Sequence, residues 1–202
     1  MATNLYVLGD EPSGEAIAID TATPCVEWLT ATLAERGWRL KLVVSTHRHW
    51  DHIGDNAAVS AATGAGIAAH IADRHGLEHP TGHLAPFPIP PSVPALDLAE
   101  GSTIRFGEIT LTILHTPGHT EGSVCLMADS EGLLFTGDTL FAGSWGRTDL
   151  PGGSEEAMVD SLGRLAGLGD DLKVLPGHGS QTTLAAEKPW LEQVIRTRLL
   201  PF

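Results

Sequence analysis

The chain has 202 residues, enough for one good-sized domain or two small ones. Hydrophobic residues make up 42% of it and charged residues 18%, a balance typical of a globular protein that excludes a disordered chain. The formal net charge of -13, with 12 Lys and Arg, disfavours nucleic acid and anionic membrane surfaces as partners, because phosphate groups require basic side chains.

The first part of the chain alternates predicted strands with predicted helices. Two apolar runs flank the turn Asp10–Gly14 and indicate a pair of strands. Thr23-Pro24 is typical of an N-cap followed by proline at the first helical position, and Gly37 ends the helix. The predicted strands are Asn4–Gly9, Glu15–Asp20, Leu40–Ser45 and Gly66–His70, and Asp55–Thr63 is a predicted helix. This alternation favours a layered α/β fold.

A proline-rich stretch, Leu77–Pro94, interrupts the pattern. It shows no hydrophobic period, so we predict a long loop. Such a loop is either a lid or binding loop, or a rigid surface connection, and the sequence leaves both interpretations open. His75, His79 and His83 lie around it, and we expect them to be solvated.

Strand patterns return after the loop and alternate again with helices. The predicted strands are Thr103–Phe106, Ile109–His115, Ser123–Ala128, Leu133–Thr136 and Leu172–Leu175. Ser154 is the predicted cap of a helix with Met158, Leu162 and Leu165 on its core side, and Leu184–Leu199 is a predicted closing helix. We see neither repeats nor a linker. The sequence therefore predicts one domain over residues 1–202, an αβ/βα sandwich of two packed β-sheets with helices outside.

Potential metal ligands gather in Thr46–Gly54, directly after the predicted strand Leu40–Ser45. The ligand-type residues of this H-x-H-x-D-H motif are His47, His49, Asp51 and His52. If the first two continue the extended run, a period of two puts both imidazoles on one side. Imidazole nitrogen and carboxylate oxygen are ligands that zinc and similar cations prefer. A polar turn in which Asp51 caps the helix and the histidines are solvated would be the favoured interpretation if the motif held only one histidine. Four ligand-type residues at this spacing favour a metal site instead.

Three more ligand-type residues, His119, Asp138 and His178, each follow a predicted strand and stand beside a glycine. The total of seven exceeds the three or four protein ligands of one zinc, and suits two metals that share a bridging carboxylate. Such metals lower the pKa of a bound water to about 7 and yield a hydroxide nucleophile. Two divalent cations, two aspartates and a hydroxide sum to about +1, a charge that attracts an anionic substrate.

With these residues in this order, the chain resembles the metallo-β-lactamase superfamily, and within it the glyoxalase II group (hydroxyacylglutathione hydrolases). The segments that carry the resemblance are Thr46–Gly54, Thr116–Ser123 and Thr136–Asp149. The resemblance implies the αβ/βα fold and a division of the ligands. The first metal would be held by His47, His49 and His119, and the second by Asp51, His52 and His178, with Asp138 as the bridge. A bridging carboxylate disfavours a true β-lactamase, since β-lactam-cleaving members carry other ligands there.

The implied activity is that of a dinuclear metal hydrolase acting on small, anionic thioesters, such as S-lactoylglutathione. Asp51 and Asp138, with the metal-bound hydroxide, would be catalytic, and the metals would be zinc, with iron or manganese as alternatives. Glyoxalase II proper carries a further C-terminal helical segment that supplies basic residues for glutathione, whereas 24 residues follow His178 here. Shorter glyoxalase II-like proteins contain the sequence motif seen here at Gly146–Gly153, and the chain is similar to these.

Two alternatives stay open beside the hydrolase. One is a mononuclear iron oxygenase, similar to the persulfide dioxygenases of this fold, which would use His47, His119 and Asp138 as a 2-His-1-carboxylate triad. The other is a non-catalytic metal-binding scaffold, which the intact set of seven ligands disfavours.

Four residues outside the ligand set have possible roles near the site. Arg147 either pairs with Asp149 to fix a loop or meets a substrate carboxylate, and the pairing is favoured. Trp50 either lines the mouth of the pocket or packs. His70 and His115 lie in predicted strands, and we expect them in the core or behind the ligands.

The sequence also bears on location. It starts without a basic region that leads into an apolar core, and no apolar run approaches the length of a membrane span. Cys25 and Cys125 lie far apart, and we expect buried free thiols in a reducing cytoplasm, although a disulfide between them stays open.

Overall fold

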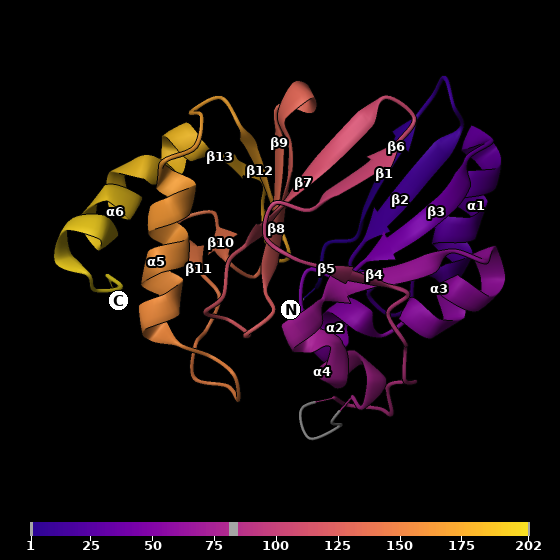
Figure 1. Cartoon of the computed structure of the whole chain (residues 1–202), viewed down its shortest axis with the longest axis horizontal. Helices are drawn as coiled ribbons and strands as arrows, with labels where there is room; N and C mark the ends of the chain where they lie inside the picture. Colours follow the sequence, from indigo (N-terminus) through magenta and orange to yellow (C-terminus); the bar gives the residue numbers. More distant parts are fainter. Residues whose placement is uncertain (1, 81–84, 202) are drawn as a thin grey trace.

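Two β-sheets lie face to face in the computed structural model, which describes residues 2–80 and 85–201 (Figure 1). Helices α1 (Val26–Arg36) and α3 (Asn56–Thr63) lie outside one sheet, at the right of the view. Helices α5 (Glu155–Ala166) and α6 (Leu184–Thr197) lie outside the other sheet, at the left. The αβ/βα sandwich expected from the sequence is therefore confirmed.

The first sheet has the strand order β1-β2-β3-β4-β5. Its strands are β1 (Tyr6–Asp10), β2 (Glu15–Ile19), β3 (Arg39–Val44), β4 (Gly66–His70) and β5 (Leu96–Leu98). β1 and β2 pair antiparallel across the turn predicted at Asp10–Gly14, and the later neighbours pair in parallel. Strands β1 to β4 match predicted strands within two residues. β5 was not predicted, because its three residues are too few to show a period.

The second sheet has the strand order β13-β12-β9-β8-β7-β6. Its strands are β6 (Thr103–Phe106), β7 (Ile109–His115), β8 (Val124–Ala128), β9 (Leu133–Gly137), β12 (Lys173–Pro176) and β13 (Thr182–Thr183). A separate hairpin joins β10 (Leu140–Phe141) to β11 (Ser144–Trp145). The shorter elements of the chain are α2 (Trp50–Ile53), α4 (Arg74–Glu78) and the 3₁₀ turns Ile71–Asp73 and Asp129–Glu131.

Strand β2 shows how the sequence builds the layers. Ile17 and Ile19 point into the core between the two sheets, while Ala16 and Ala18 face the outer core under α1. Successive side chains of a strand point to opposite faces, so a strand buried on both faces has a continuous apolar run. On the far side, α5 buries Met158 and its predicted core neighbours against the second sheet. The sheets are thus apolar on both faces, and each outer face is covered by helices.

One predicted helix start is wrong. α1 begins at Val26 with Cys25 at the N-cap, so Thr23 does not cap it. The Asp55 carboxylate instead fixes the chain just before the helix, since it accepts a hydrogen bond from the Cys25 backbone N–H at 2.7 Å and another from the Thr23 hydroxyl. Contacts from a distant part of the chain leave no local sequence signal. The Ser154 cap of α5 is confirmed, because its side chain accepts a hydrogen bond from the Ala157 N–H at 3.2 Å.

The proline-rich stretch is packed where the structure describes it; residues 81–84, which include His83, lie outside the described residues. The Phe87 ring meets the Trp50 ring edge-on, with centroids 5.8 Å apart. Ile89 is buried, and the Ser92 N–H donates to the Leu77 carbonyl at 2.9 Å. His75 and His79 are exposed, as expected.

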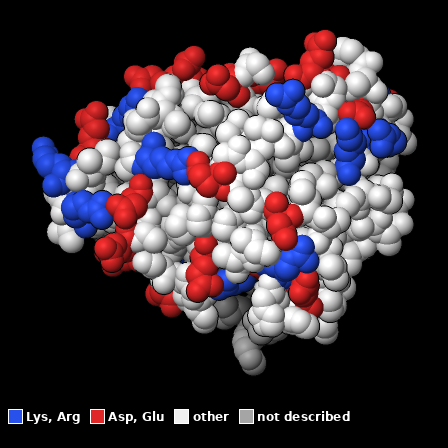
Figure 2. Space-filling model, viewed as in Figure 1, with Lys and Arg blue, Asp and Glu red and all other residues white. Residues whose placement is uncertain are grey.

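Basic and acidic side chains alternate on the face shown in Figure 2 rather than gathering by sign. Exposed ion pairs such as Arg164–Glu100 and Arg198–Asp160 account for part of this mixing. Among the described residues, no helix combines the length and apolar character needed to cross a bilayer. Cys25 and Cys125 are buried free thiols, so the structure confirms this prediction and closes the disulfide alternative.

Candidate metal centre

The directions of the strands explain why distant residues meet at one edge of the sandwich. β7 and β9 both pair antiparallel with β8, and β9 pairs in parallel with β12, so β7, β9 and β12 run in the same direction. Their carboxyl ends therefore lie at the same edge, where they lead to His119, Asp138 and His178. The turn after β3 brings Thr46–Gly54 to this edge from the first sheet. A hydrogen bond of 2.9 Å from the Val124 N–H to the Thr46 carbonyl joins the two sheets there.

All seven predicted ligands come together. Their ligand atoms form overlapping groups within which every pair lies within 4.8 Å, namely His47–His49–His119, His47–His52–Asp138 and Asp51–His52–His178. His49 Nδ1 lies 2.7 Å from His119 Nε2, and His52 Nε2 lies 3.2 Å from His178 Nε2. The expected strand period was not the cause, because β3 ends at Val44 before the first histidine. The turn itself brings the His47 and His49 rings to 4.8 Å between centroids.

Asp138 lies close to histidines of both expected metal sites, His119 of the first group and His52 and His178 of the second. Its Oδ2 is 3.4 Å from His119 Nε2 and also 3.4 Å from His178 Nε2. Its Oδ1 is 3.4 Å from His52 Nε2. The carboxylate thus faces both groups.

Two buried polar atoms of this centre have no hydrogen-bond partner among the described residues. They are His47 Nε2 and Asp138 Oδ1. A buried nitrogen or oxygen left without a partner costs roughly 1–3 kcal/mol, so such atoms call for an explanation. Divalent cations, which bind imidazole nitrogen and carboxylate oxygen, would satisfy both. The residues therefore fit divalent metal ions.

Three of the five histidine rings are held in place on their far side by another group. His52 Nδ1 lies 2.9 Å from Asp20 Oδ2, and His119 Nδ1 donates to the Arg147 carbonyl at 2.7 Å. His178 Nδ1 donates to the Ala2 carbonyl at 3.0 Å. Such contacts fix the ring orientation and leave the other nitrogen free for a metal.

Asp20 is a positioning residue that the sequence did not reveal. Besides His52, it accepts hydrogen bonds from the Thr46 N–H and hydroxyl, both at 2.8 Å. It is buried and has a positive φ of 58°. Its place at the end of a predicted strand was the only hint in the sequence.

Asp73 is a second such residue, and it ties the first motif to the His119 turn. Its buried carboxylate accepts from the Arg48 N–H and from Arg48 Nη1. It also accepts from the Thr120 hydroxyl at 2.6 Å and the Gly122 N–H at 3.0 Å. Arg48 reaches on to the Pro151 carbonyl at 2.8 Å. Nothing local in the sequence marks these contacts.

The three histidines expected to hold the first metal have lowered pKa values, which favour their neutral forms. Burial lowers the pKa of His47 well below its usual value, and neighbouring histidines lower it further. Burial and His119 lower the pKa of His49 to about 3. Burial also lowers the pKa of His119, although Asp138 acts against it. A histidine binds a metal through its neutral form, so this environment favours metal binding.

The other half of the centre is dominated by carboxylates. Burial lowers the pKa of His178, but hydrogen bonds to Asp138 and Asp51 outweigh it and raise the pKa to about 10. Burial also lowers the pKa of His52, but Asp138 and Asp20 outweigh it, so the pKa is raised. The pKa values of Asp51 and Asp138 are lowered despite burial, through His178 and His52. These carboxylates attract positive charge, which divalent cations would supply.

Gly177 shows why glycine stands beside a ligand. A Cβ added at this position would lie 2.7 Å from His52 Cε1 and would collide with the Asp138 carboxylate. The backbone passes too close to two ligands for any side chain, so the glycine serves close approach rather than a special turn.

The metallo-beta-lactamase superfamily model matches residues 1–178 of the chain. The chain belongs to this superfamily. An uncharacterized protein of Mycobacterium tuberculosis (strain ATCC 25618 / H37Rv) is 37% identical over 215 residues, which cover 97% of this chain and 96% of that protein. The hydroxyacylglutathione hydrolase of Methylococcus capsulatus is 38% identical over 178 residues, which cover 86% of this chain and 61% of the hydrolase. The glyoxalase II-like resemblance is therefore confirmed, and the match covers less than two thirds of that hydrolase.

Solved structures of the superfamily show the same fold. The BLEG-1 B3 metallo-beta-lactamase has a TM-score of 0.86 and 33% identity, over 94% of each chain. TTHA1623, solved in a di-iron-bound form, has a TM-score of 0.81 and 32% identity, over 92% of this chain and 91% of its own. ETHE1 from Myxococcus xanthus has a TM-score of 0.78 and 27% identity, over 99% of this chain and 88% of its own.

In this member of the superfamily a cavity of about 710 Å³ is lined by five of the seven predicted ligands, namely His49, Asp51, His119, Asp138 and His178. Arg147 and Trp50 line it. The Arg147 guanidinium pairs with both oxygens of Asp149 at 2.6 and 2.7 Å, so the predicted ion pair is confirmed. Trp50 lines the cavity and also packs against Phe87, so it has both of the roles that the sequence left open. His70 and His115 stack on each other with centroids 4.0 Å apart and lie outside the ligand groups.

Proposed function

We propose that the chain is a dinuclear metal-dependent hydrolase of small thioesters, similar to glyoxalase II, with S-acylglutathiones such as S-lactoylglutathione as its substrate class. The observation that carries this proposal is the pair of ligand groups on either side of Asp138, with buried His47 Nε2 and Asp138 Oδ1 lacking hydrogen-bond partners among the described residues. We also propose that residues 1–202 act as one domain.

Each ligand has a role in this proposal. The first metal would be held by His47, His49 and His119, the second by Asp51, His52 and His178, and Asp138 would bridge them. Two divalent cations, zinc first with iron or manganese as alternatives, would supply a water that is acidic near neutral pH and a positive charge for the developing oxyanion.

The side chains would prepare the centre for this chemistry. The lowered pKa values of Asp51 and Asp138 keep both carboxylates ionised, so that they would hold the cations beside the attacking water. The contacts of His52, His119 and His178 behind the ligand atoms would keep the rings from turning during the reaction. The net charge of about +1 would favour an anionic thioester.

Relatives support a hydrolase. Two hydroxyacylglutathione hydrolases, from Methylococcus capsulatus and Cereibacter sphaeroides, are each 38% identical to the chain over 86% of it. TTHA1623 in its di-iron-bound form supports a centre with two ions, and with iron as an alternative to zinc.

Hydrolysis of a β-lactam is the second candidate. The bridging carboxylate disfavours it, yet the 33% identity to the BLEG-1 B3 metallo-beta-lactamase over 94% of each chain favours it. A β-lactam amide and a thioester are both acyl groups open to attack by the same activated water, so the two activities require the same centre. The mononuclear iron oxygenase remains a third outcome for the experiment to separate.

Metal content per chain, measured beside three activities, tests the proposal. The activities are hydrolysis of S-lactoylglutathione, hydrolysis of a chromogenic cephalosporin, and oxygen uptake with glutathione persulfide. We expect about two metals and thioester hydrolysis. Faster cephalosporin hydrolysis would favour the second candidate, and a single iron with oxygen uptake would overturn the hydrolase.

The His49→Ala variant tests the ligand assignment. It removes a first-site ligand, so we expect metal content to fall and thioester hydrolysis to disappear. The control is His75→Ala on α4, an exposed histidine outside the ligand groups, which should keep both. Full activity of His49→Ala would contradict the assignment.

A further inference from the structure

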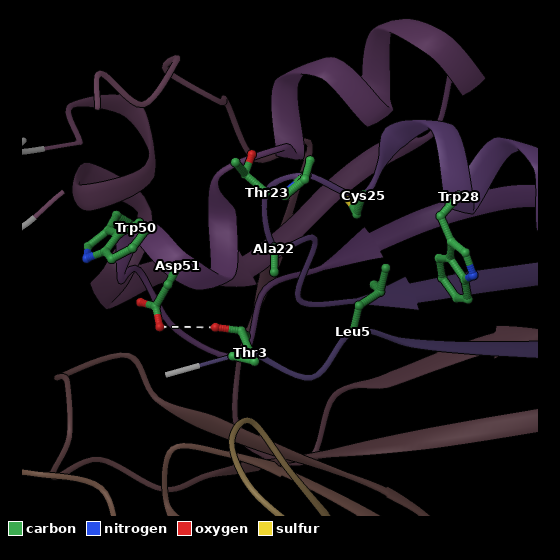
Figure 3. Close-up of a pocket in the computed structure, with 10 residues that line it drawn as sticks. Thr3, Leu5, Ala22, Thr23, Cys25, Trp28, Trp50 and Asp51 are labelled. Carbon is green, nitrogen blue, oxygen red and sulfur yellow. Dashed lines mark hydrogen bonds between the residues drawn. The ribbon is translucent and has the colours of Figure 1, made fainter. Parts of the chain in front are cut away.

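A second hollow lies behind the metal centre. It is a groove of about 400 Å³ that begins at Trp50 and Asp51 and extends toward Trp28 on α1. Figure 3 shows Trp50 and Asp51 at one end, Trp28 at the other, and Leu5 and Ala22 between them. Ala2, Pro24 and Cys25 complete its apolar lining.

We propose that this groove is an acyl-chain subsite, which takes the apolar alkyl part of the substrate's acyl group. The proposal rests on the thioester hydrolase function. The first argument is position. Trp50 and Asp51 line the groove and also the metal-facing cavity, so the two hollows are neighbours with these two residues between them, and an acyl chain that crosses them would enter the groove.

The second argument is charge. Among the described residues that line the groove, Asp51 carries the only charge, and there is no Lys or Arg. The thiol part of a glutathione thioester carries carboxylates, which find no basic partner among these residues. The metal-facing cavity, in contrast, is lined by Arg147, whose guanidinium also pairs with Asp149. We therefore expect the charged thiol part of a thioester to lie in the cavity and the apolar acyl part to lie in the groove.

The third argument is the state of the lining groups. The Thr3 hydroxyl donates to Asp51 Oδ2 at 3.1 Å (Figure 3). The same oxygen lies 3.2 Å from His178 Nε2. The polar groups at this end are thus engaged with each other. At the other end, the Trp28 side chain is 55% exposed. A large apolar surface in water gains free energy when an apolar chain covers it.

Thioesters of one uncharged thiol, N-acetylcysteamine, test the subsite through their acyl chains, from acetyl to butyryl, hexanoyl and octanoyl. We expect kcat/KM to rise by roughly threefold to fourfold per methylene until the groove is filled, which corresponds to ~0.8 kcal/mol for each buried methylene. Trp28→Ala should lower that factor toward one. The control Ile195→Ala removes an exposed apolar side chain from α6 and should keep the wild-type factor. A steep chain-length dependence that survives in Trp28→Ala would overturn the subsite.

Binding of 1-octanol, followed by NMR of the tryptophan indole N–H groups, tests the groove without any turnover. Signals are assigned by single Trp→Phe variants. Trp28 lines the groove and Trp145 lines the metal-facing cavity, so their signals report the two hollows separately. We expect Trp28 to shift and Trp145 to remain in place. A shift of Trp145 alone would place the chain in the cavity and overturn the proposal. If Trp28 shifts but no thioester is hydrolysed, the proposed function fails while the groove still binds apolar chains.

Discussion

Asp73 accepts hydrogen bonds from Arg48 at two points, the backbone N–H at 2.9 Å and the guanidinium at 2.8 Å. Because the same carboxylate holds Thr120 and Gly122, it fixes the turns of His47–His52 and His119 against each other. The ligand geometry of the centre therefore depends on a residue that touches none of the ligand atoms described above.

Replacing this carboxylate should cost stability as well as metal. Asp73→Ala removes the buried acceptor of four hydrogen bonds and leaves the mostly buried Arg48 guanidinium with only the exposed Glu121 carboxylate and the Pro151 carbonyl, so we expect the free energy of unfolding to fall by about 3–5 kcal/mol. Urea unfolding measures it, and metal content should fall in parallel. The control is Asp97→Ala, which removes an exposed partner of Arg74 and should change neither value measurably. Equal losses in both variants would contradict the role of Asp73.

Asp138 should decide how many metals are bound. Asp138→Ala removes the carboxylate that faces both histidine groups, so we expect fewer than the two metals per chain of the wild type, measured by elemental analysis after dialysis. Asp149→Ala removes an exposed carboxylate near the cavity and should keep the wild-type number. An unchanged metal count in Asp138→Ala would argue against a shared bridge.

Two Gly→Ala substitutions should change stability in opposite directions. Gly163 lies inside α5, and an added Cβ would make only an ordinary contact of 3.5 Å with Ile195 Cγ1. Ala at a helical position should therefore stabilise the protein by about 0.5–1 kcal/mol. Gly132 also has room for a Cβ but has φ of 64°, so Ala there should destabilise by about 1–2 kcal/mol. Thermal and urea unfolding of both variants test this pair; a shift of the same sign in both would refute it.

The Cys125 thiol should make stability fall at alkaline pH. Burial raises the pKa of this thiol to about 11, whereas an unfolded thiol has a pKa of about 8.5. Between these values the unfolded chain loses the proton and the folded chain keeps it, so the contribution of the thiol is complete below the lower value and declines as pH rises toward the higher one. The decline reaches at most about 1.4 kcal/mol per pH unit.

Urea unfolding of the wild type and of Cys125→Ala between pH 8 and pH 10 measures this effect. We expect the free energy of unfolding to fall less steeply with pH in the variant. The comparison uses slopes, because the smaller side chain lowers the stability at every pH. Parallel curves would show that the thiol does not contribute.

The sequence predicted the elements that carry their own pattern. β6 and β7 agree residue for residue with their apolar runs, and Gly37 ends α1 as expected. The hairpin of β10 and β11 was missed, because strands of two residues show no period and form only where partners surround them. Each ligand stood beside a turn glycine or within a dense motif, so the ligand set was visible.

The residues behind the ligands were not visible, for a different physical reason. Asp20 acts on His52 across 32 positions of sequence, and Asp73 acts on Thr120 across 47. Their contacts arise from the packing of the sheets. The local sequence around Asp20, after a strand, and around Asp73, in a 3₁₀ turn, would be the same whether or not these contacts formed. The hydrogen bonds of Asp55 to Cys25 and Thr23 follow the same logic.

The division of the ligands between the two sheets has a mechanical consequence. His47, His49, Asp51 and His52 follow a strand of one sheet, while His119, Asp138 and His178 follow strands of the other. Bound cations would therefore cross-link the two layers at their open edge, and neither layer could bind them alone. The affinity for the metals would therefore depend on how closely the two layers pack against each other. A cavity made in the core between them, far from every ligand, would weaken metal binding more than one of equal size under the outer helices.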